Sequence, residues 1–327
     1  MKRIVFILAL FLIAATKPAF AQEVSLGIYP PILDITATPP AQIKAPITLS
    51  NDSDKPVSLR IGLQPFKSQR TNDGQIEFIP DLTGPDPKLL NKVQVIDGDT
   101  AVDTVTIDSL QEKTLTLLID LDKDTSLGDY YFSVIFLSNK PGQPTSSGAD
   151  IPSGIGTNVL LSIGPKGKTR GSIDDFSAPF FTTGGPVRFN LALNNESDHF
   201  ILPTGTVVIQ NMLGQRVGKL DILPQYLLAH SSRNLRQRPE STSSSQFVDI
   251  IDRQIGTPYV FWPEKFLFGI YTATVTLALS DNGPIVTSKT VFIALPIPFI
   301  AIASIVIFIT AGIYLRVTKK LSKLHKE

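Results

Sequence analysis

The sequence has 327 residues, 43% of them hydrophobic, with a formal net charge of +1 and no cysteine. The lack of cysteine excludes disulfide bonds and thiolate metal ligands, so the folded parts must be stabilised by buried apolar area. A balanced charge of this kind gives no support to a nucleic-acid-binding protein.

The chain begins with a pattern typical of an export signal. Lys2 and Arg3 precede an apolar run at residues 4–15, and a small-x-small cleavage site follows at residues 19–21. The sequence predicts a signal peptide at residues 1–21 and a mature chain that starts at Gln22. If the run stayed uncleaved it would act as an anchor, although it is short for a membrane span.

Residues 22–165 consist of short apolar runs separated by turn residues. The expected strands are 24–29, 35–38, 47–50, 57–63, 75–79, 104–107, 114–119, 130–137 and 159–163. Several alternate polar with apolar side chains, as strands with one buried face do, and no helical period precedes the C-terminal segment. Many short strands with Pro- and Gly-rich turns predict an antiparallel β-sandwich.

The first sandwich is expected to end near Pro165. Residues 141–156 have loop composition, and the apolar run at 159–163 reads as the closing strand of this domain. Residues 22–165 carry 10 Lys and Arg against 18 Asp and Glu, a balance of −8, whereas residues 166–293 carry 12 against 10. An acidic first half gains nothing from counterion release on anionic polymers, so nucleic acid is not an expected partner.

Residues 166–293 repeat the pattern of the first half. Asn51 lies in the run Leu-Ser-Asn-Asp-Ser-Asp, and Asn195 lies in Leu-Asn-Asn-Glu-Ser-Asp. Tyr130 and Tyr271 each follow Gly-x at the start of a late strand, where a tyrosine often bonds back to the chain at a corner of a sandwich. The sequence predicts two tandem Ig-like sandwiches derived from one unit, with these four residues in structural roles.

Two groups in the second half are candidates for binding. Tyr259, Phe261 and Trp262 belong to the densest aromatic segment, which fits either a binding surface or the filling of a sandwich core. Arg233 and Arg236 could meet an acidic partner or solvate an edge strand, and we favour the second interpretation. The role of the Ser-rich insertion at residues 239–260 stays open.

No metal, cofactor or catalytic site is predicted. Asp120, Asp122 and Asp124 have the spacing of a calcium loop, but the position that needs Gly holds Thr125 and the one that needs Glu holds Tyr131. A solvated turn is the favoured interpretation, and calcium binding stays open. No nucleophile elbow occurs, so the chain is expected to be no enzyme.

The C-terminal segment is apolar and then basic. Residues 294–315 contain no charged side chain and have the roughly 20 apolar residues that a membrane helix needs. The tail at residues 316–327 follows, with the cations Arg316, Lys319, Lys320 and Lys323. Positive flanks stay on the cytoplasmic side, which predicts a single-pass protein of the cell membrane with its N-terminus outside and its C-terminus inside.

Taken together, several motifs resemble the bacterial WxL-interacting, peptidoglycan-binding cell-surface proteins. They are the signal peptide, an opening strand with Pro30 and Pro31, the Asn51 turn, both Gly-x-Tyr strands, the serine-arginine strand around Arg233, Trp262, and the anchor with its basic tail. The Ser-rich insertion departs from the family pattern. The resemblance implies a cell-surface binding or scaffolding protein whose partner is a cell-wall glycan or a wall-associated protein.

An alternative function also follows from the predicted fold. Paired Ig-like domains can act as extracytoplasmic chaperones or assembly factors by adding a strand to a partner. Free edge strands would favour this alternative.

Overall fold

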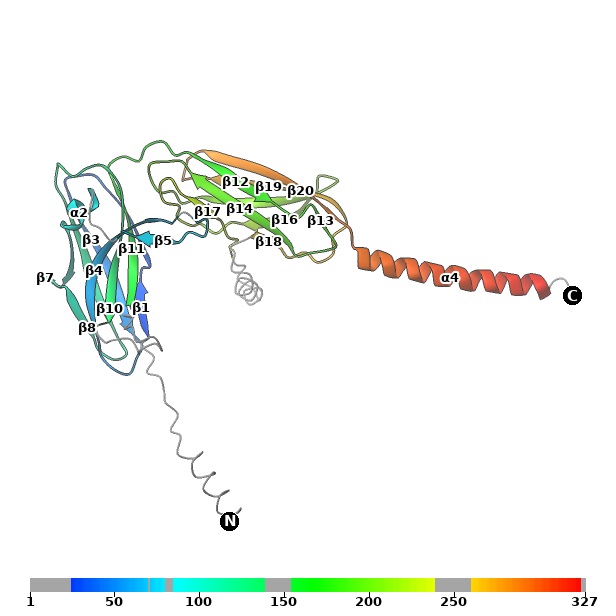
Figure 1. Ribbon diagram of the computed structural model, residues 1–327, viewed down its shortest axis with the longest axis horizontal. Helices are drawn as coiled ribbons and strands as arrows, with labels where there is room; N and C mark the ends of the chain where they lie inside the picture. The colour runs from blue at the N-terminus through cyan, green and yellow to red at the C-terminus, as the bar shows by residue number, and fades with distance from the viewer. Residues whose placement is uncertain (1–24, 70, 80–84, 139–153, 239–259, 325–327) are drawn as a thin grey trace, which may run out of the picture.

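The computed structural model describes residues 25–69, 71–79, 85–138, 154–238 and 260–324. It shows two Ig-like β-sandwiches followed by one long helix (Figure 1). Domain 1 contains β1 to β11, and domain 2 contains β12 to β20. The chain passes from one to the other at residues 164–170. The predicted all-β fold with a C-terminal helix is confirmed, and the predicted signal peptide lies outside the described residues.

Domain 1 consists of two facing sheets. The first has the order β1-β3-β9-β6-β7, formed by Leu26–Tyr29, Ala41–Asn51, Gln111–Leu121, Val93–Asp97 and Thr100–Ala101. The second has the order β2-β11-β10-β4-β5, formed by Ile32–Ala37, Gly154–Ile163, Gly128–Ser138, Val57–Ser68 and Ile76–Phe78, and β8 (Thr104–Ile107) also pairs with β4. Alternate residues of β9 are buried, so Leu115, Leu117 and Ile119 fill the space between the sheets.

Domain 2 has the same two-layer design. One sheet holds β12 (Gly171–Ser177), β14 (Val187–Asn195), β17 (Ser232–Asn234) and β18 (Val260–Trp262). The other has the order β13-β20-β19-β15-β16, formed by Phe181–Thr182, Ile285–Ala294, Gly269–Ala278, Thr204–Asn211 and Arg216–Asp221. Both β17 and β18 pair with β14, at its opposite ends. The insertion therefore interrupts one edge strand, and residues 239–259 lie outside the described residues.

The first strand of each domain changes sheets in the same way. In domain 1, β1 pairs antiparallel with β3, and β2 then pairs parallel with β11. In domain 2, β12 pairs antiparallel with β14, and β13 then pairs parallel with β20. The two domains share one topology, as expected of a duplicated unit.

Two buried asparagines hold equivalent turns together. Asn51 donates to the backbone carbonyls of Lys55, Ile107 and Asp108, and its side-chain oxygen accepts the Ser53 amide. Asn195 repeats these bonds with the carbonyls of His199, Leu227 and Leu228 and with the amide of Ser197. Both side chains are buried, with exposed fractions of 1% for Asn51 and 0% for Asn195.

The two tyrosines also occupy equivalent corners. The Tyr130 hydroxyl donates to the carbonyl of Ser126 at 3.0 Å, and the Tyr271 hydroxyl donates to the carbonyl of Phe268 at 3.2 Å. Each bond ties a buried ring to the turn before its strand, which is the structural role expected from the Gly-x-Tyr pattern.

Some elements differ from the sequence prediction. A short helix that the sequence analysis did not anticipate, α2 (Pro85–Leu90), lies in domain 1. Six residues are too few to show a helical period. The strand expected at 159–163 begins earlier, at Gly154, inside the stretch predicted as a loop. The sequence analysis also missed strand β6, because β6 is short and begins only three residues after helix α2 ends.

The C-terminal helix α4 spans Ile297–Leu324. Its segment Phe299–Arg316 has a mean hydropathy of 2.1 and is exposed, so the helix is long and apolar enough to cross a membrane. Arg316 is exposed at the end of this segment, whereas the side chains of Lys319, Lys320 and Lys323 lie outside the described residues.

Candidate protein-binding site

The two domains meet through a small apolar cluster. Phe66 and Leu160 of domain 1 pack with Phe200 and Leu228 of domain 2, and all four side chains are buried. The ring of Tyr131 lies between them, 6.1 Å from the Phe66 ring and 6.4 Å from the Phe200 ring. Apolar contact of this kind gives the two sandwiches a defined relative orientation.

Asp129 forms the polar centre of the same junction. Its Oδ2 accepts the backbone amide of Phe200 at 2.7 Å and the hydroxyl of Tyr131 at 3.0 Å, and its Oδ1 accepts the Ser162 hydroxyl. The Tyr131 oxygen in turn accepts the amide of Ala229. Burial, followed by the Asp129 charge, raises the pKa of Tyr131 far above its usual value, so this phenol stays protonated.

His199 lies beside this network, and its burial predicts a pH dependence for the stability of domain 2. Burial lowers the pKa of its ring, and the Lys166 charge adds to this effect, while the charges of Asp129 and Asp198 oppose it. The unfolded chain therefore takes up a proton before the folded one does. The contribution of His199 to the stability of domain 2 is fully present above the unfolded pKa of about 6.5 and is lost as the pH falls below that value.

We expect acidification from about pH 7.5 to about pH 5.5 to lower the melting temperature of domain 2, and His199→Gln to reduce this acid sensitivity. Calorimetry at the two pH values measures both. His230 is the control, because it is exposed and bonds only Asp198 among the described residues, so His230→Gln should leave the sensitivity in place. An unchanged acid response in His199→Gln would contradict the assignment.

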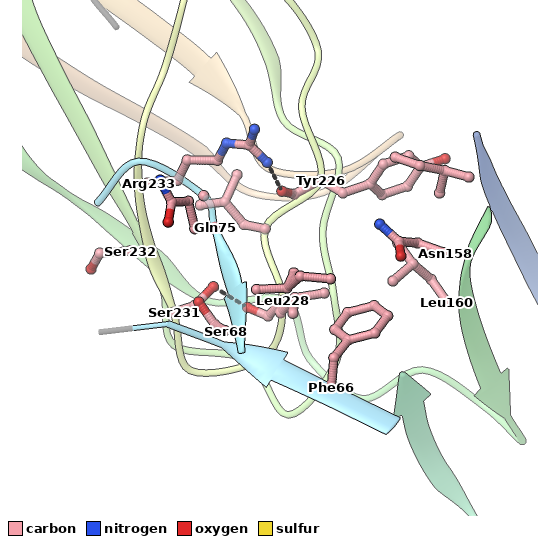
Figure 2. A pocket seen from close by; sticks show the side chains of 14 residues that line it. Phe66, Ser68, Gln75, Asn158, Leu160, Tyr226, Leu228, Ser231, Ser232 and Arg233 are labelled. Atoms are coloured by element: carbon pink, nitrogen blue, oxygen red, sulfur yellow. Dashed lines mark hydrogen bonds between the residues drawn. The ribbon is translucent and has the colours of Figure 1, made fainter. Parts of the chain in front are cut away.

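Arg233 lines a pocket at the junction (Figure 2). Its Nη1 donates to the carbonyl of Tyr226 at 3.0 Å, and its guanidinium lies against the positive-φ Gly74 in the turn of domain 1. Its buried Nε has no partner among the described residues. Burial, followed by the Arg236 charge, lowers the pKa of Arg233. The expectation of a cation that solvates an edge strand is wrong for Arg233, because domain 1 covers it.

The pocket itself is too small for an organic ligand. Its volume is about 80 Å³. One liquid water occupies about 30 Å³, so the pocket has room for two or three water molecules. We therefore interpret this site as part of the contact between the domains.

Two of the other predicted binding residues, Phe261 and Trp262, are buried instead of forming an exposed surface. The Trp262 ring packs 5.5 Å from the Tyr271 ring in the core of domain 2. The alternative interpretation, a sandwich core that needs large residues, is correct for Trp262. Arg236 is exposed, and Tyr259 lies outside the described residues.

No group of three or more His, Asp or Glu that could hold a metal occurs among the described residues. In the Asp120 turn, the Asp122 carboxylate instead forms an ion pair with Lys92. The turn keeps the solvated character that we favour from the sequence.

Among the described residues of domain 2, the outer edge of β20 has a ladder partner only near its C-terminal end. Its inner edge pairs with β19 over its whole length, but β13 pairs with the outer edge only at Ile293 and Ala294. The amide of Ile293 donates outward, to Phe180. Since alternate residues of a strand point the same way, the amides of Thr287, Lys289 and Val291 face outward too. No ladder partner covers residues 285–291 on that side within the described part of the chain.

In domain 1, the edge of β11 that corresponds to the outer edge of β20 is paired with another strand. There β2 pairs with β11 over six residues, from Asn158 to Ile163. The same topology thus has a closed edge in one domain and an open one in the other. The sequence signal for this difference is weak, because it depends on where the first strand of each domain changes sheets.

No family model matches the sequence, and no curated protein matches it. Several solved structures resemble the fold. A chain from a chaperone–tip adhesin complex of CFA/I fimbriae biogenesis is 12% identical, with 68% of this chain and 95% of that chain covered and a TM-score of 0.35. The class 5 fimbriae chaperone CfaA is 11% identical (74% and 100% covered, TM-score 0.35), and the E. coli chaperone DraB is 10% identical (81% and 96% covered, TM-score 0.34). Identities this low concern the fold alone.

Proposed function

We propose that the chain is a membrane-anchored assembly factor or scaffold that binds an extended segment of a partner protein as an added strand on β20. The open outer edge of that strand carries the proposal. Main-chain hydrogen bonds to such an edge provide affinity, and side chains at alternate positions provide specificity.

The edge has the properties that strand addition requires. Residues 285–291 read Ile-Val-Thr-Ser-Lys-Thr-Val, a run rich in the β-branched residues that favour extended backbone. Outward amides alternate along it, so a partner strand would find donors at a regular spacing. Lys289 lies in the middle, where a charge discourages two copies of the edge from pairing with each other.

The proposal includes no catalysis and places both sandwiches outside the cytoplasm. Its support is the open edge, together with the signal-like N-terminus and the basic segment after the apolar helix, which favour this orientation. A strand added to β20 would run along the axis that leads to the anchor, because β20 ends only two residues before α4.

Thr287→Pro tests this function. Proline removes the outward amide of residue 287, which bonds nothing in the described structure, so the fold should persist while strand addition is lost. A photo-crosslinking residue at position 289 reports the partner in cells that make the full chain. We expect the crosslinked product to disappear in Thr287→Pro, with an unchanged melting temperature.

Two matched variants complete this experiment. Thr287→Val keeps the amide and should keep the crosslink. Ser288→Pro removes an amide that faces β19 and should destabilise domain 2. Full crosslinking in a folded Thr287→Pro variant would contradict strand addition.

The family resemblance and the wall-glycan partner that it implies stay predictions. Sugar-binding surfaces use exposed aromatic rings, and in domain 2 such rings gather at one end, beside the start of α4.

A further inference from the structure

Domain 2 carries an exposed apolar surface at the end where α4 begins. We call it the apolar base, and it consists of Phe180, Phe181, Met212, Leu213, Phe266, Phe268 and Ile270. Phe180 and Leu213 are each 74% exposed. A group of large apolar side chains in water is costly unless something covers it, so the base indicates a contact surface.

Strand register brings these residues together. Phe181 and Ile270 both pair with Ile293, from either side of β20, so the three side chains form one row across the sheet. The Met212 side chain reaches Gly269, where an added Cβ would lie 2.1 Å from its terminal carbon. The base therefore combines the β13 segment, the turn after β15 and the start of β19 at a single end of the domain.

The base is continuous with the apolar helix. The Phe266 ring lies 5.5 Å from the ring of Phe299, in an edge-to-face contact. Phe299 is the first residue of the segment that is apolar enough to cross a membrane. In Figure 1, α4 leaves domain 2 directly from the end of β20. Phe266 of the apolar base therefore contacts the first residue of the apolar span.

The length of the connection decides how far the base can lie from a bilayer. Only Leu295 and Pro296 separate β20 from α4. Fully extended residues span at most about 3.6 Å each, so the connection reaches about 10 Å. The headgroup layer on each side of the hydrocarbon core is about 5–8 Å thick. The end of domain 2 is therefore confined to that layer or its surface.

We propose that the apolar base is seated in the headgroup layer of the membrane that α4 spans, so that domain 2 rests on the lipid. Aromatic side chains are enriched at this depth, where their rings contact both acyl chains and headgroups. Lipid is the occupant that this geometry favours over a second copy of the chain, because the anchor brings lipid to the base in every molecule. This seat fixes domain 2 and leaves the start of β20, near Ile285, at the far end of the domain.

The cysteine-free sequence allows a direct test. The full chain is reconstituted in phosphatidylcholine vesicles at low protein density, with one cysteine that carries an environment-sensitive fluorophore. Leu213→Cys and Phe180→Cys place the fluorophore on the base. Ile285→Cys is the control, since Ile285 is 66% exposed at the opposite end of β20.

We expect both base fluorophores to lose most of their emission to lipids with a nitroxide near the headgroup, and to be shielded from aqueous iodide. The Ile285 fluorophore should respond in the opposite way. All three substitutions replace exposed side chains, and unchanged melting temperatures will verify the fold.

Three results would overturn the proposal. Equal access of iodide to all three fluorophores would show that domain 2 stands clear of the bilayer. Shielding from iodide without quenching by the nitroxide lipid would mean that protein covers the base. If the chain did not float with the vesicles, α4 would not be inserted in the bilayer, and the proposal would have no basis.

Discussion

Asn195→Asp is expected to destabilise domain 2 by about 3–5 kcal/mol, the range found when a buried charge is left uncompensated. The asparagine amide donates to three backbone carbonyls, at 2.9 Å to His199, 2.8 Å to Leu228 and 3.3 Å to Leu227. A carboxylate donates nothing and would place its charge against these three oxygens. Since a whole domain is stable by about 5–15 kcal/mol, calorimetry should show an early melting transition for domain 2.

The same change on an exposed part of the strand is the control. Asn190 also lies on β14, but it is exposed, and among the described residues its side chain makes one bond, of 3.4 Å to Ser177, so Asn190→Asp should change stability little. Asn51→Asp should repeat the effect in domain 1, where the bonds are equivalent. Similar melting of the Asn190 and Asn195 variants would refute the role of the buried amide.

Asp129→Ala is expected to weaken the contact between the domains by about 1.5–3 kcal/mol, because the Phe200 amide of domain 2 loses its charged acceptor in domain 1. Spin labels on Glu112→Cys in domain 1 and Val217→Cys in domain 2, both exposed in the parent, can measure the outcome as a distance distribution. The distribution should be narrow in the parent and broad in Asp129→Ala, while each sandwich still melts cooperatively.

Asp34→Ala provides the comparison for this prediction. Asp34 also bonds across the junction, accepting the Tyr226 hydroxyl at 3.2 Å, but the contact is exposed. Exposed contacts of this type contribute little, so its distribution should stay narrow. Equal broadening in the two variants, or none in Asp129→Ala, would contradict the central role of Asp129.

The features that the sequence predicted correctly depend on neighbours along the chain. The Asn51 and Asn195 turns and the corners at Tyr130 and Tyr271 follow from spacing within a few residues. The alternation of polar and apolar side chains likewise identified most strands. The short helix α2 gave no such signal.

Features that depend on distant segments were not predictable. From the sequence alone, Arg233 looks like a surface cation, because nothing near it in the chain indicates that the distant turn around Gly74 packs against it. Asp129 was missed as well, although one signal existed. In the repeated Gly-x-Tyr motif, the middle position is Asp129 in domain 1 and Ile270 in domain 2. The first of these residues contacts the other domain and the second belongs to the apolar base, so a difference between equivalent positions marked both surfaces.

The parallel pairing of β2 with β11 and of β13 with β20 also determines how the molecule would bear a mechanical load. Because the first and last strands of each domain run in the same direction, the chain enters a sandwich at one end and leaves it at the other. A pull between the membrane and a distant partner would act along the strands. The ten residues of β20 are held by bonds perpendicular to that pull, so they would have to shear together instead of opening one after another.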